Sequence, residues 1–156
     1  MLRIYTDTSV IGGCLDEEFA KDSQRLFDMA RKGRIVIVIS QVVIDELAEA
    51  PQGVQDLLPS LPMSALEIAP LTPQVIALRN AYLRAGIVGP RWVDDATHVA
   101  AAAVARASAI VSWNFRHIVR LDRIAGYNQV NRQYGYDDLV IVTPMEVARD
   151  TTDPDE

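Results

Sequence analysis

The chain has 156 residues, of which 49% are hydrophobic and 23% are charged, and a formal net charge of −6 at pH 7. This length and composition fit one globular domain with a sizeable core, and the apolar runs are far shorter than the ~20 residues that a membrane-spanning helix needs. Cys14 is the only cysteine, which excludes an intramolecular disulfide and a cysteine-based zinc cluster. The first residues lead into a strand pattern rather than a signal-peptide pattern, so we expect a cytoplasmic protein without membrane association.

The acidic balance is weak evidence against a nucleic-acid partner. Four of the acids lie near the C-terminus: Asp150, Asp153, Asp155 and Glu156. Without these four the formal net charge of the chain is −2. Others belong to the candidate site described below, whose charge a bound cation would offset.

The first third of the chain predicts strands and helices in alternation. An apolar run predicts a strand over residues 2–6, and an acid-capped helix should follow over 16–32. Five consecutive β-branched residues at 35–39 are typical of a central parallel strand that is covered on both faces. Ser40 should cap the next helix, which Pro51 ends.

The remaining elements continue this alternation. Over the middle of the chain we expect a short helix and a turn over 51–62, a brief strand over 65–69, a helix from Thr72-Pro73 to Gly86 and an alanine-rich helix over 95–106. Towards the C-terminus we expect a strand over 109–112, a helix over 116–134 interrupted at Gly126, a strand over 139–142 and a short helix from Thr143-Pro144. The pattern predicts a three-layer α/β/α sandwich with a mainly parallel central sheet, as a single domain over 1–148 with an acidic, frayed tail over 149–156.

Three carboxylates and one amide lie where such a sheet would gather them. Asp7 follows the first strand, Glu46 lies inside a helix, Asp95 opens another helix, and Asn114 follows a later strand. Ligands bind beyond the carboxyl ends of parallel strands, and clustered carboxylates repel one another unless they share protons or hold a cation. All-oxygen ligands suit Mg²⁺ or Mn²⁺. We therefore expect metal-dependent phosphodiester cleavage, with these four as catalytic residues and the three acids as metal ligands.

Two of these assignments have alternatives. Asp7 could cap the turn that follows it, and Asp94 competes with Asp95, since one of the two could cap the helix while the other binds the metal. We choose Asp95 because its helical spacing places it on the same inward face as His98. Glu46 is a ligand or an orienter of the nucleophilic water, and Asn114 gives outer support. The supporting residues are Thr8, Ser40, Asp94 and His98.

Basic residues flank the candidate site in the sequence. Arg116 and Arg120 follow Asn114, and Arg91 precedes Asp95. Arginine favours bidentate contacts with phosphate, so these arginines and His117 are candidate substrate contacts. The alternative for the arginines is a solvated helix face.

Four motifs follow one another along the chain: Asp7-Thr8-Ser9 after the first strand, Ser40 followed by Glu46, Asp95-Ala96-Thr97-His98-Val99-Ala100, and Ser112-Trp113-Asn114-Phe115-Arg116-His117. Together they resemble the PIN-domain nucleases, and among them the small stand-alone VapC-like toxins of type II toxin–antitoxin pairs. The resemblance implies a PIN-like fold and a Mg²⁺- or Mn²⁺-dependent endoribonuclease that acts on RNA, forms a homodimer and is inhibited by a cognate antitoxin. Family members commonly carry a fourth acid where this chain has Asn114, which leaves open whether one or two ions bind. The alternative function is a catalytically silent PIN-like module that binds RNA or protein.

Overall fold

The computed structural model describes the backbone of residues 1–150 and the side chains of residues 1–147. Residues 149–150 belong to the last helix, and the remainder of the expected frayed tail, 151–156, lies outside the described residues. None of the helices within 1–150 is long and apolar enough to cross a membrane.

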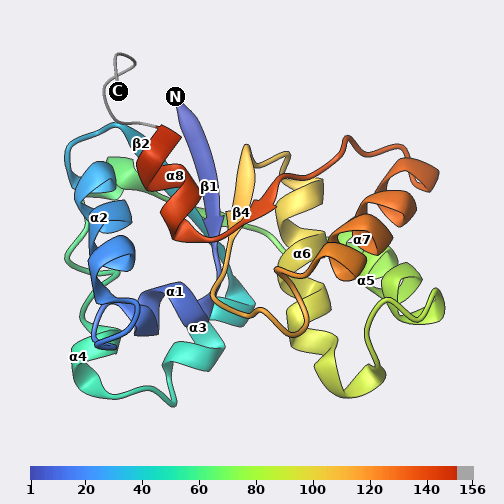
Figure 1. Ribbon diagram of the computed structural model, residues 1–156, viewed down its shortest axis with the longest axis horizontal. Coiled ribbons are helices and arrows are strands. Elements are labelled where there is room, and N and C mark those ends of the chain that lie inside the picture. Colours follow the sequence, from blue (N-terminus) through green and yellow to red (C-terminus); the bar gives the residue numbers. More distant parts are fainter. Residues whose placement is uncertain (151–156) are drawn as a thin grey trace.

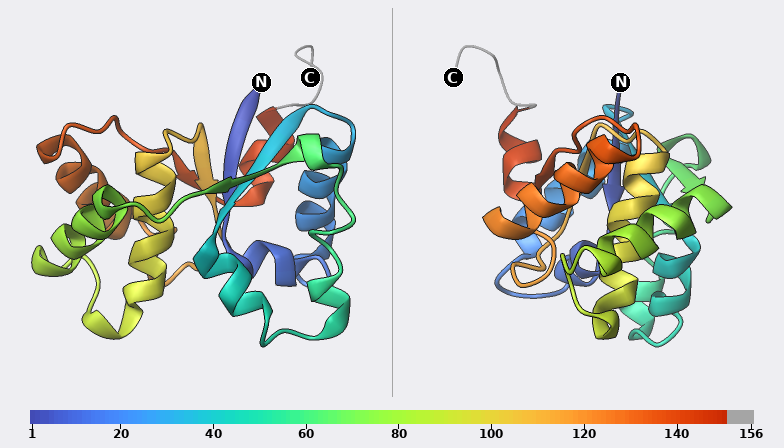
Figure 2. Two further views of the ribbon diagram at one scale, coloured as in Figure 1. Left: turned by 180° about the vertical axis from the view of Figure 1, so that it is seen from behind. Right: turned by 90° about the vertical axis from the view of Figure 1, so that its right-hand side faces the viewer.

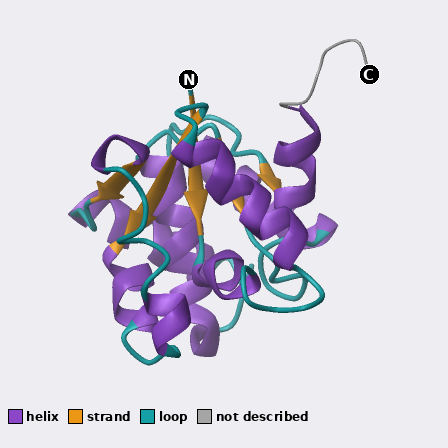
Figure 3. Ribbon diagram, turned by 90° about the vertical axis from the view of Figure 1, so that its left-hand side faces the viewer, coloured by secondary structure: helices purple, strands orange, loops and turns teal. Residues whose placement is uncertain are grey.

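One five-stranded sheet forms the centre of the fold, with all strands parallel and in the order β3-β2-β1-β4-β5. The strands are β1 (Leu2–Thr6), β2 (Ile35–Ser40), β3 (Leu66–Ala69), β4 (Ala109–Val111) and β5 (Ile141–Val142). In the register of the sheet, Ile4 of β1 lies opposite Ile37 of β2 and Ala109 of β4. The predicted parallel sheet is confirmed, and Figure 3 shows its strands side by side with helices on either side.

Helices cover both faces of this sheet. They are α1 (Thr8–Gly13), α2 (Ala20–Arg31), α3 (Gln41–Leu47), α4 (Gln52–Gln55), α5 (Pro73–Arg84), α6 (Val93–Val104), α7 (Leu121–Gln133) and α8 (Pro144–Asp150), with 3₁₀ turns η1 (Met63–Ala65) and η2 (Pro90–Trp92). Figure 1 shows α2 and α8 on one side of the strands and α5, α6 and α7 on the other. Two further views show α5 packed beside both α6 and α7 (Figure 2). This arrangement confirms the three-layer sandwich.

The packing explains why these sequences form these layers. Ile37, Val38 and Ile39 of β2 are at most 1% exposed, as the unbroken β-branched run predicts for a strand that is covered on both faces. Ala100 and Ala102 of α6 are fully buried, since small side chains allow this helix to lie close to the sheet. The strands are therefore held in a closely packed core. Beyond the carboxyl end of β1, helices α1 and α3 lie next to each other (Figure 1).

Several element bounds differ from the sequence-based expectations. The first long helix begins at Ala20 rather than residue 16, because Asp16 closes a turn by accepting the backbone N–H of Glu18 at 2.9 Å. The helix that carries Glu46 ends at Leu47, before Pro51. Strand β5 is shorter than expected.

The stretch after β4 also differs. Residues 116–120 form turns, and α7 then runs without interruption through Gly126. A Cβ at Gly126 would lie 2.6 Å from Cδ1 of Ile87, so this glycine allows close packing rather than a break in the helix.

Candidate active site

Asp7 lies where the central strand β1 gives way to α1. Its side chain is 4% exposed, and its Oδ1 accepts the backbone N–H of Val10 at 3.3 Å, which makes Asp7 the N-cap of α1. The capping interpretation is therefore confirmed. The same position leaves Asp7 at the carboxyl edge of the sheet, close enough to Asp95 and His98 for their charges to interact.

Two serine hydroxyls hold the Asp7 carboxylate in place. Ser9 donates to Oδ1 and Ser112 donates to Oδ2, each at 2.6 Å. The same hydroxyl oxygens accept the backbone N–H groups of Trp113 and Asn114, each at 2.9 Å, which ties the end of β4 to the end of β1. Burial raises the pKa of Asp7, although a nearby positive charge and these hydrogen bonds oppose the rise. Sequence reasoning missed both serines; the available signal was a serine beside each of two strand ends that meet.

Glu46 extends from α3 toward the same edge of the sheet. Its Oε1 accepts the hydroxyl of Thr8 at 3.1 Å and lies 2.6 Å from Nε2 of His98. Burial opposes ionisation of Glu46, but the hydrogen bond and the charge of His98 outweigh it and hold the pKa of Glu46 below its usual value. Glu46 is therefore an ionised carboxylate whose orientation is fixed by two donors.

His98 connects Glu46 to the buried part of β1. The hydroxyl of Tyr5 lies 2.8 Å from His98 Nδ1 and 2.7 Å from the hydroxyl of Ser40. Burial disfavours the charged form of His98, yet the hydrogen bond with Glu46 and the surrounding carboxylate charges raise its pKa. Ser40 is the N-cap residue of α3, as expected, but its hydroxyl makes no capping hydrogen bond and faces Tyr5 instead of the helix.

Asp95 lies in the first turn of α6 and faces the other two acids. The pKa of Asp95 is raised to about 6, chiefly by burial and also by the charges of Asp7 and Glu46, while the charge of His98 lowers it. A hydrogen bond from Asn114 acts in the opposite direction. Three carboxylates from separate elements therefore interact through charge at one edge of the sheet.

The structure also distinguishes Asp94 from Asp95. Helix α6 begins at Val93, and neither acid makes a side-chain capping hydrogen bond, so the expectation that one of them caps the helix is wrong. Asp94 is exposed, whereas Asp95 is half-buried and interacts with Asp7 and Glu46. These differences favour Asp95 as the member of the site.

The donor set fits a hard divalent cation. Asp7, Glu46 and Asp95 offer carboxylate oxygens, and a cation among them would offset the mutual repulsion that contributes to the raised pKa of Asp95. Over the described side chains, no three His, Cys, Asp or Glu residues lie in positions from which they could hold a metal ion together as they stand. Asp7 and Glu46 are each bonded to donors from the protein.

The predicted substrate contacts lie around a stack of side chains beside the acids. The guanidinium of Arg91 lies 5.1 Å from the centre of the Trp92 ring, and Trp92 stacks on His117 with ring centres 4.1 Å apart. His117 is 9% exposed, and neither ring nitrogen has a hydrogen-bond partner within the described residues. Burial lowers the pKa of His117, and the charges of nearby arginines, including Arg116 and Arg120, lower it further. The ring is therefore neutral and lies in positively charged surroundings.

The two arginines after Asn114 differ in their partners. Arg120 forms an ion pair with Asp122 at 2.6 Å, which engages its guanidinium. Arg116 is exposed and takes part in none of the ion pairs found over residues 1–147. Arg116 is therefore the more available of the two for a phosphate.

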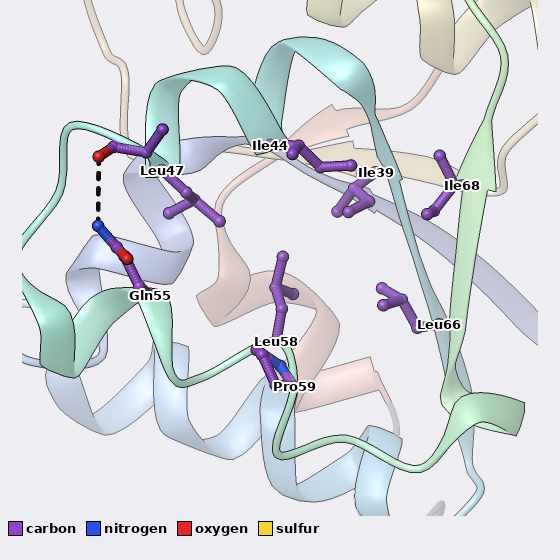
Figure 4. A pocket seen from close by; sticks show the side chains of 9 residues that line it. Ile39, Ile44, Leu47, Gln55, Leu58, Pro59, Leu66 and Ile68 are labelled. Carbon is purple, nitrogen blue, oxygen red and sulfur yellow. Dashed lines mark hydrogen bonds between the residues drawn. The ribbon is translucent and has the colours of Figure 1, made fainter.

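An apolar pocket of about 370 Å³ lies on the side of α3 away from the acids, between α3, α4, β2 and β3. Figure 4 shows Ile44 and Leu47 of α3 facing Leu58 and Leu66 across it, and Gln55 donates to the carbonyl of Ala48 at 3.2 Å on its rim. Helix α3 thus has an apolar pocket on one side and the Glu46 carboxylate on the other.

Comparison with known families matches the PIN domain to residues 3–116, a range that includes the four candidate catalytic residues. The chain belongs to the PIN-domain family. PIN domains are nucleases and generally use divalent metal ions. The match agrees with the resemblance that the sequence motifs indicate.

Comparison with solved structures supports the fold of this PIN domain. Similar structures include VapBC2 from Rickettsia felis bound to a DNA fragment from their promoter, with 16% identity and a TM-score of 0.55. The alignment covers 90% of this chain and 97% of that one. No curated protein matches the chain.

Proposed function

We propose that this PIN domain is a metal-dependent endoribonuclease and the toxin of a type II toxin–antitoxin pair. The observation that carries the proposal is the convergence of Asp7, Glu46 and Asp95 at the carboxyl edge of the sheet, where the charges of Asp7 and Glu46 raise the pKa of Asp95 and all three acids raise the pKa of His98. Such a concentration of negative charge is costly in a half-buried site unless a cation offsets it. The ion would be Mg²⁺ or Mn²⁺, as the oxygen donors favour.

Each candidate catalytic residue has a distinct role in this proposal. Asp7 and Asp95 are direct ligands, and the two serines keep Asp7 in one orientation. Glu46 is a ligand or orients the nucleophilic water, and Asn114 holds Asp95 by a hydrogen bond. A bound ion of this kind supplies a polarised phosphate oxygen and a water of lowered pKa.

The substrate proposed for this site is RNA. The charges of Arg116 and Arg120 act on His117, and Arg91 lies over the Trp92 ring that stacks on His117. Guanidinium groups suit the phosphates of a nucleic-acid strand. Among them we expect Arg116→Ala to weaken RNA binding more than Arg120→Ala, because Arg120 is paired with Asp122. RNA binding measured by fluorescence anisotropy at several salt concentrations tests this order. Loss of one phosphate contact should reduce the slope of log K against log salt concentration by about one.

The toxin role, the antitoxin and the homodimer are proposed from the family resemblance, together with a cytoplasmic location. The similar solved structure is that of VapBC2 bound to a DNA fragment from its promoter, and this similarity supports the proposal that the chain has a partner protein. Co-purification of the chain with the product of a neighbouring gene tests the antitoxin, and light scattering of the isolated chain tests the homodimer.

The decisive experiment is cleavage of a labelled RNA pool by wild type, Asp7→Asn and Asp94→Asn, each with Mg²⁺, Mn²⁺ or EDTA. We expect cleavage by the wild type only with metal, loss of cleavage in Asp7→Asn, and near wild-type cleavage in Asp94→Asn, which is a matched change at an exposed acid. A folded wild type that cuts no RNA under any of these conditions would favour the silent binding module instead.

A further inference from the structure

We propose that Tyr5, His98 and Ser40 form a buried hydrogen-bonded chain whose task is to position Glu46 for the metal ion. This inference rests on the proposed function, since it gives Glu46 a role toward a cation. It adds positioning residues that lie behind the carboxylates, within the core of the protein.

The chain of contacts is continuous from the core to the site. Ser40 Oγ lies 2.7 Å from Tyr5 Oη, Tyr5 Oη lies 2.8 Å from His98 Nδ1, and His98 Nε2 lies 2.6 Å from Glu46 Oε1. Tyr5 and Ser40 are fully buried, His98 is 2% exposed, and the Glu46 side chain is 36% exposed. The polar chain therefore begins inside the sheet and ends at the accessible carboxylate.

The direction of the hydrogen bond to Glu46 does not depend on the charge of His98. If the ring is neutral with its proton on Nε2, Nδ1 accepts from Tyr5, and Tyr5 accepts from Ser40. If the ring is charged, Nδ1 donates to Tyr5, which then donates to Ser40. In both cases the Nε2–H group donates to Glu46, so the carboxylate meets a fixed donor.

The geometry at Glu46 shows what this donor achieves. The hydrogen bonds that Glu46 accepts over the described side chains, from His98 and from Thr8, both go to Oε1. Two donors on one oxygen restrict the plane of the carboxylate, and Oε2 would then be the oxygen available to a cation. Because Thr8 directly follows Asp7, its hydrogen bond also fixes the position of the Glu46 carboxylate relative to Asp7.

A purely structural role would not require this set of side chains. Phenylalanine would fill the space of Tyr5 in β1 without a hydroxyl, and burying polar groups is costly unless each is paired. Here each buried polar group is paired, and the chain of pairs ends at a residue of the site. Partners that hold a ligating carboxylate typically contribute 10- to 100-fold to metal affinity.

The test is Mn²⁺ affinity, measured by titration calorimetry on the full chain for wild type, Tyr5→Phe, His98→Leu and His98→Gln. We expect His98→Leu to weaken Mn²⁺ binding by about 10- to 100-fold and Tyr5→Phe to weaken it less. His98→Gln keeps an N–H donor toward Glu46, so it should recover most of the affinity. Tyr82→Phe is the matched control, because it removes another fully buried hydroxyl, bonded to Asn131, away from the acids.

The outcomes separate this inference from the proposed function. If wild type binds Mn²⁺ and the folded Tyr5→Phe and His98→Leu variants bind it equally well, the positioning role is overturned while the metal site stands. If wild type binds no Mn²⁺, the metal-dependent function and the positioning role fall together. Should His98→Leu not fold, Tyr5→Phe against Tyr82→Phe still decides the question, with circular dichroism to verify folding.

Discussion

The side-chain oxygen of Asn114 accepts the backbone N–H of His117 at 2.9 Å, and that of Arg116 at 3.1 Å. This oxygen is therefore turned toward the loop, and the NH₂ group of Asn114 is left to donate to Asp95. At this position the chain has a hydrogen-bond donor rather than a carboxylate.

Asn114→Asp should therefore make the protein more dependent on metal. The new carboxylate can keep the bonds to the loop, but it places a negative charge beside Asp95 without the former donor. We expect a loss of about 1 kcal/mol of stability in EDTA and a larger gain on adding Mn²⁺ than in wild type. Thermal unfolding with and without Mn²⁺ measures both effects. In an Asp95→Asn background the loss in EDTA should shrink, and equal responses to Mn²⁺ in wild type and Asn114→Asp would contradict the expectation.

Ser9→Ala and Ser112→Ala should each destabilise the metal-free protein by about 1.5–3 kcal/mol, because each removes a hydrogen bond to the buried Asp7 carboxylate. Urea unfolding in EDTA measures the cost. Ser60→Ala, at an exposed serine, should change stability by no more than ~0.5 kcal/mol. The double variant should lose less than the sum of the single losses, since both serines act on one carboxylate. Losses no larger than that of Ser60→Ala would show that the serines do not hold Asp7.

The stability of the metal-free protein should fall as the pH rises from about 4 to 7, in part because of Asp95. The pKa of Asp95 is about 6 in the folded protein, against 3.8 for an unperturbed aspartate, so between these pH values the folded state binds more protons than the unfolded state. Asp95→Asn should remove this component and stabilise the protein at pH 7 by about 1–2 kcal/mol, a value reduced for the partial exposure of the side chain. Denaturant unfolding at pH 5 and pH 7 in EDTA provides the comparison.

The control for that prediction is Asp94→Asn, the neighbouring exposed acid. Asp94→Asn removes the same charge from the same helical turn but leaves Asp7, Glu46 and Asp95 unchanged. If both variants shift the pH dependence equally, the effect belongs to the charge of the helix terminus and not to the carboxylate cluster.

Gly13→Ala should destabilise the protein by at least ~2 kcal/mol. A Cβ at Gly13 would lie 2.6 Å from the Ser23 hydroxyl and 2.9 Å from Nε1 of Trp113, two groups that are themselves hydrogen-bonded at 2.8 Å. Gly12→Ala is the matched change one residue earlier in α1, where a Cβ would meet nothing within 4 Å. It should be neutral or stabilising by up to ~1 kcal/mol, because alanine favours helix over glycine. Thermal unfolding of the two variants side by side gives the result, and equal stabilities would contradict the packing argument.

The sequence could predict the edge at which the site lies because chain direction determines it. Once the strands are parallel, Asp7 after β1 and Asn114 after β4 must lie at the same edge of the sheet. The helical spacing in α6 likewise placed Asp95 and His98 on one face. These positions follow from local pattern and from one topological rule.

The hydrogen-bonded partners could not be predicted in the same way. Tyr5 lies within an apolar strand and reads as a core residue, and its partner His98 is 93 positions away. Ser40 is a favourable helix cap by residue type, but the Tyr5 hydroxyl offers a buried partner that a local pattern does not reveal. Helix α1 was not predicted, because Gly12 and Gly13 disfavour a helix. In the structure Gly13 is needed for close packing, since a Cβ there would lie too near Ser23 and Trp113.

The tie between Asp7 and Ser112 spans 105 positions of the chain. The first carboxylate of the site therefore reaches its final setting only after the strand that carries Ser112 has been added beside β1. During synthesis on the ribosome, a nascent chain that ends before β4 has Asp7, Glu46 and Asp95 but lacks Ser112 and Asn114, which form hydrogen bonds with Asp7 and Asp95. We therefore expect any activity of this site to begin only after the ribosome has added the segment that carries Ser112 and Asn114.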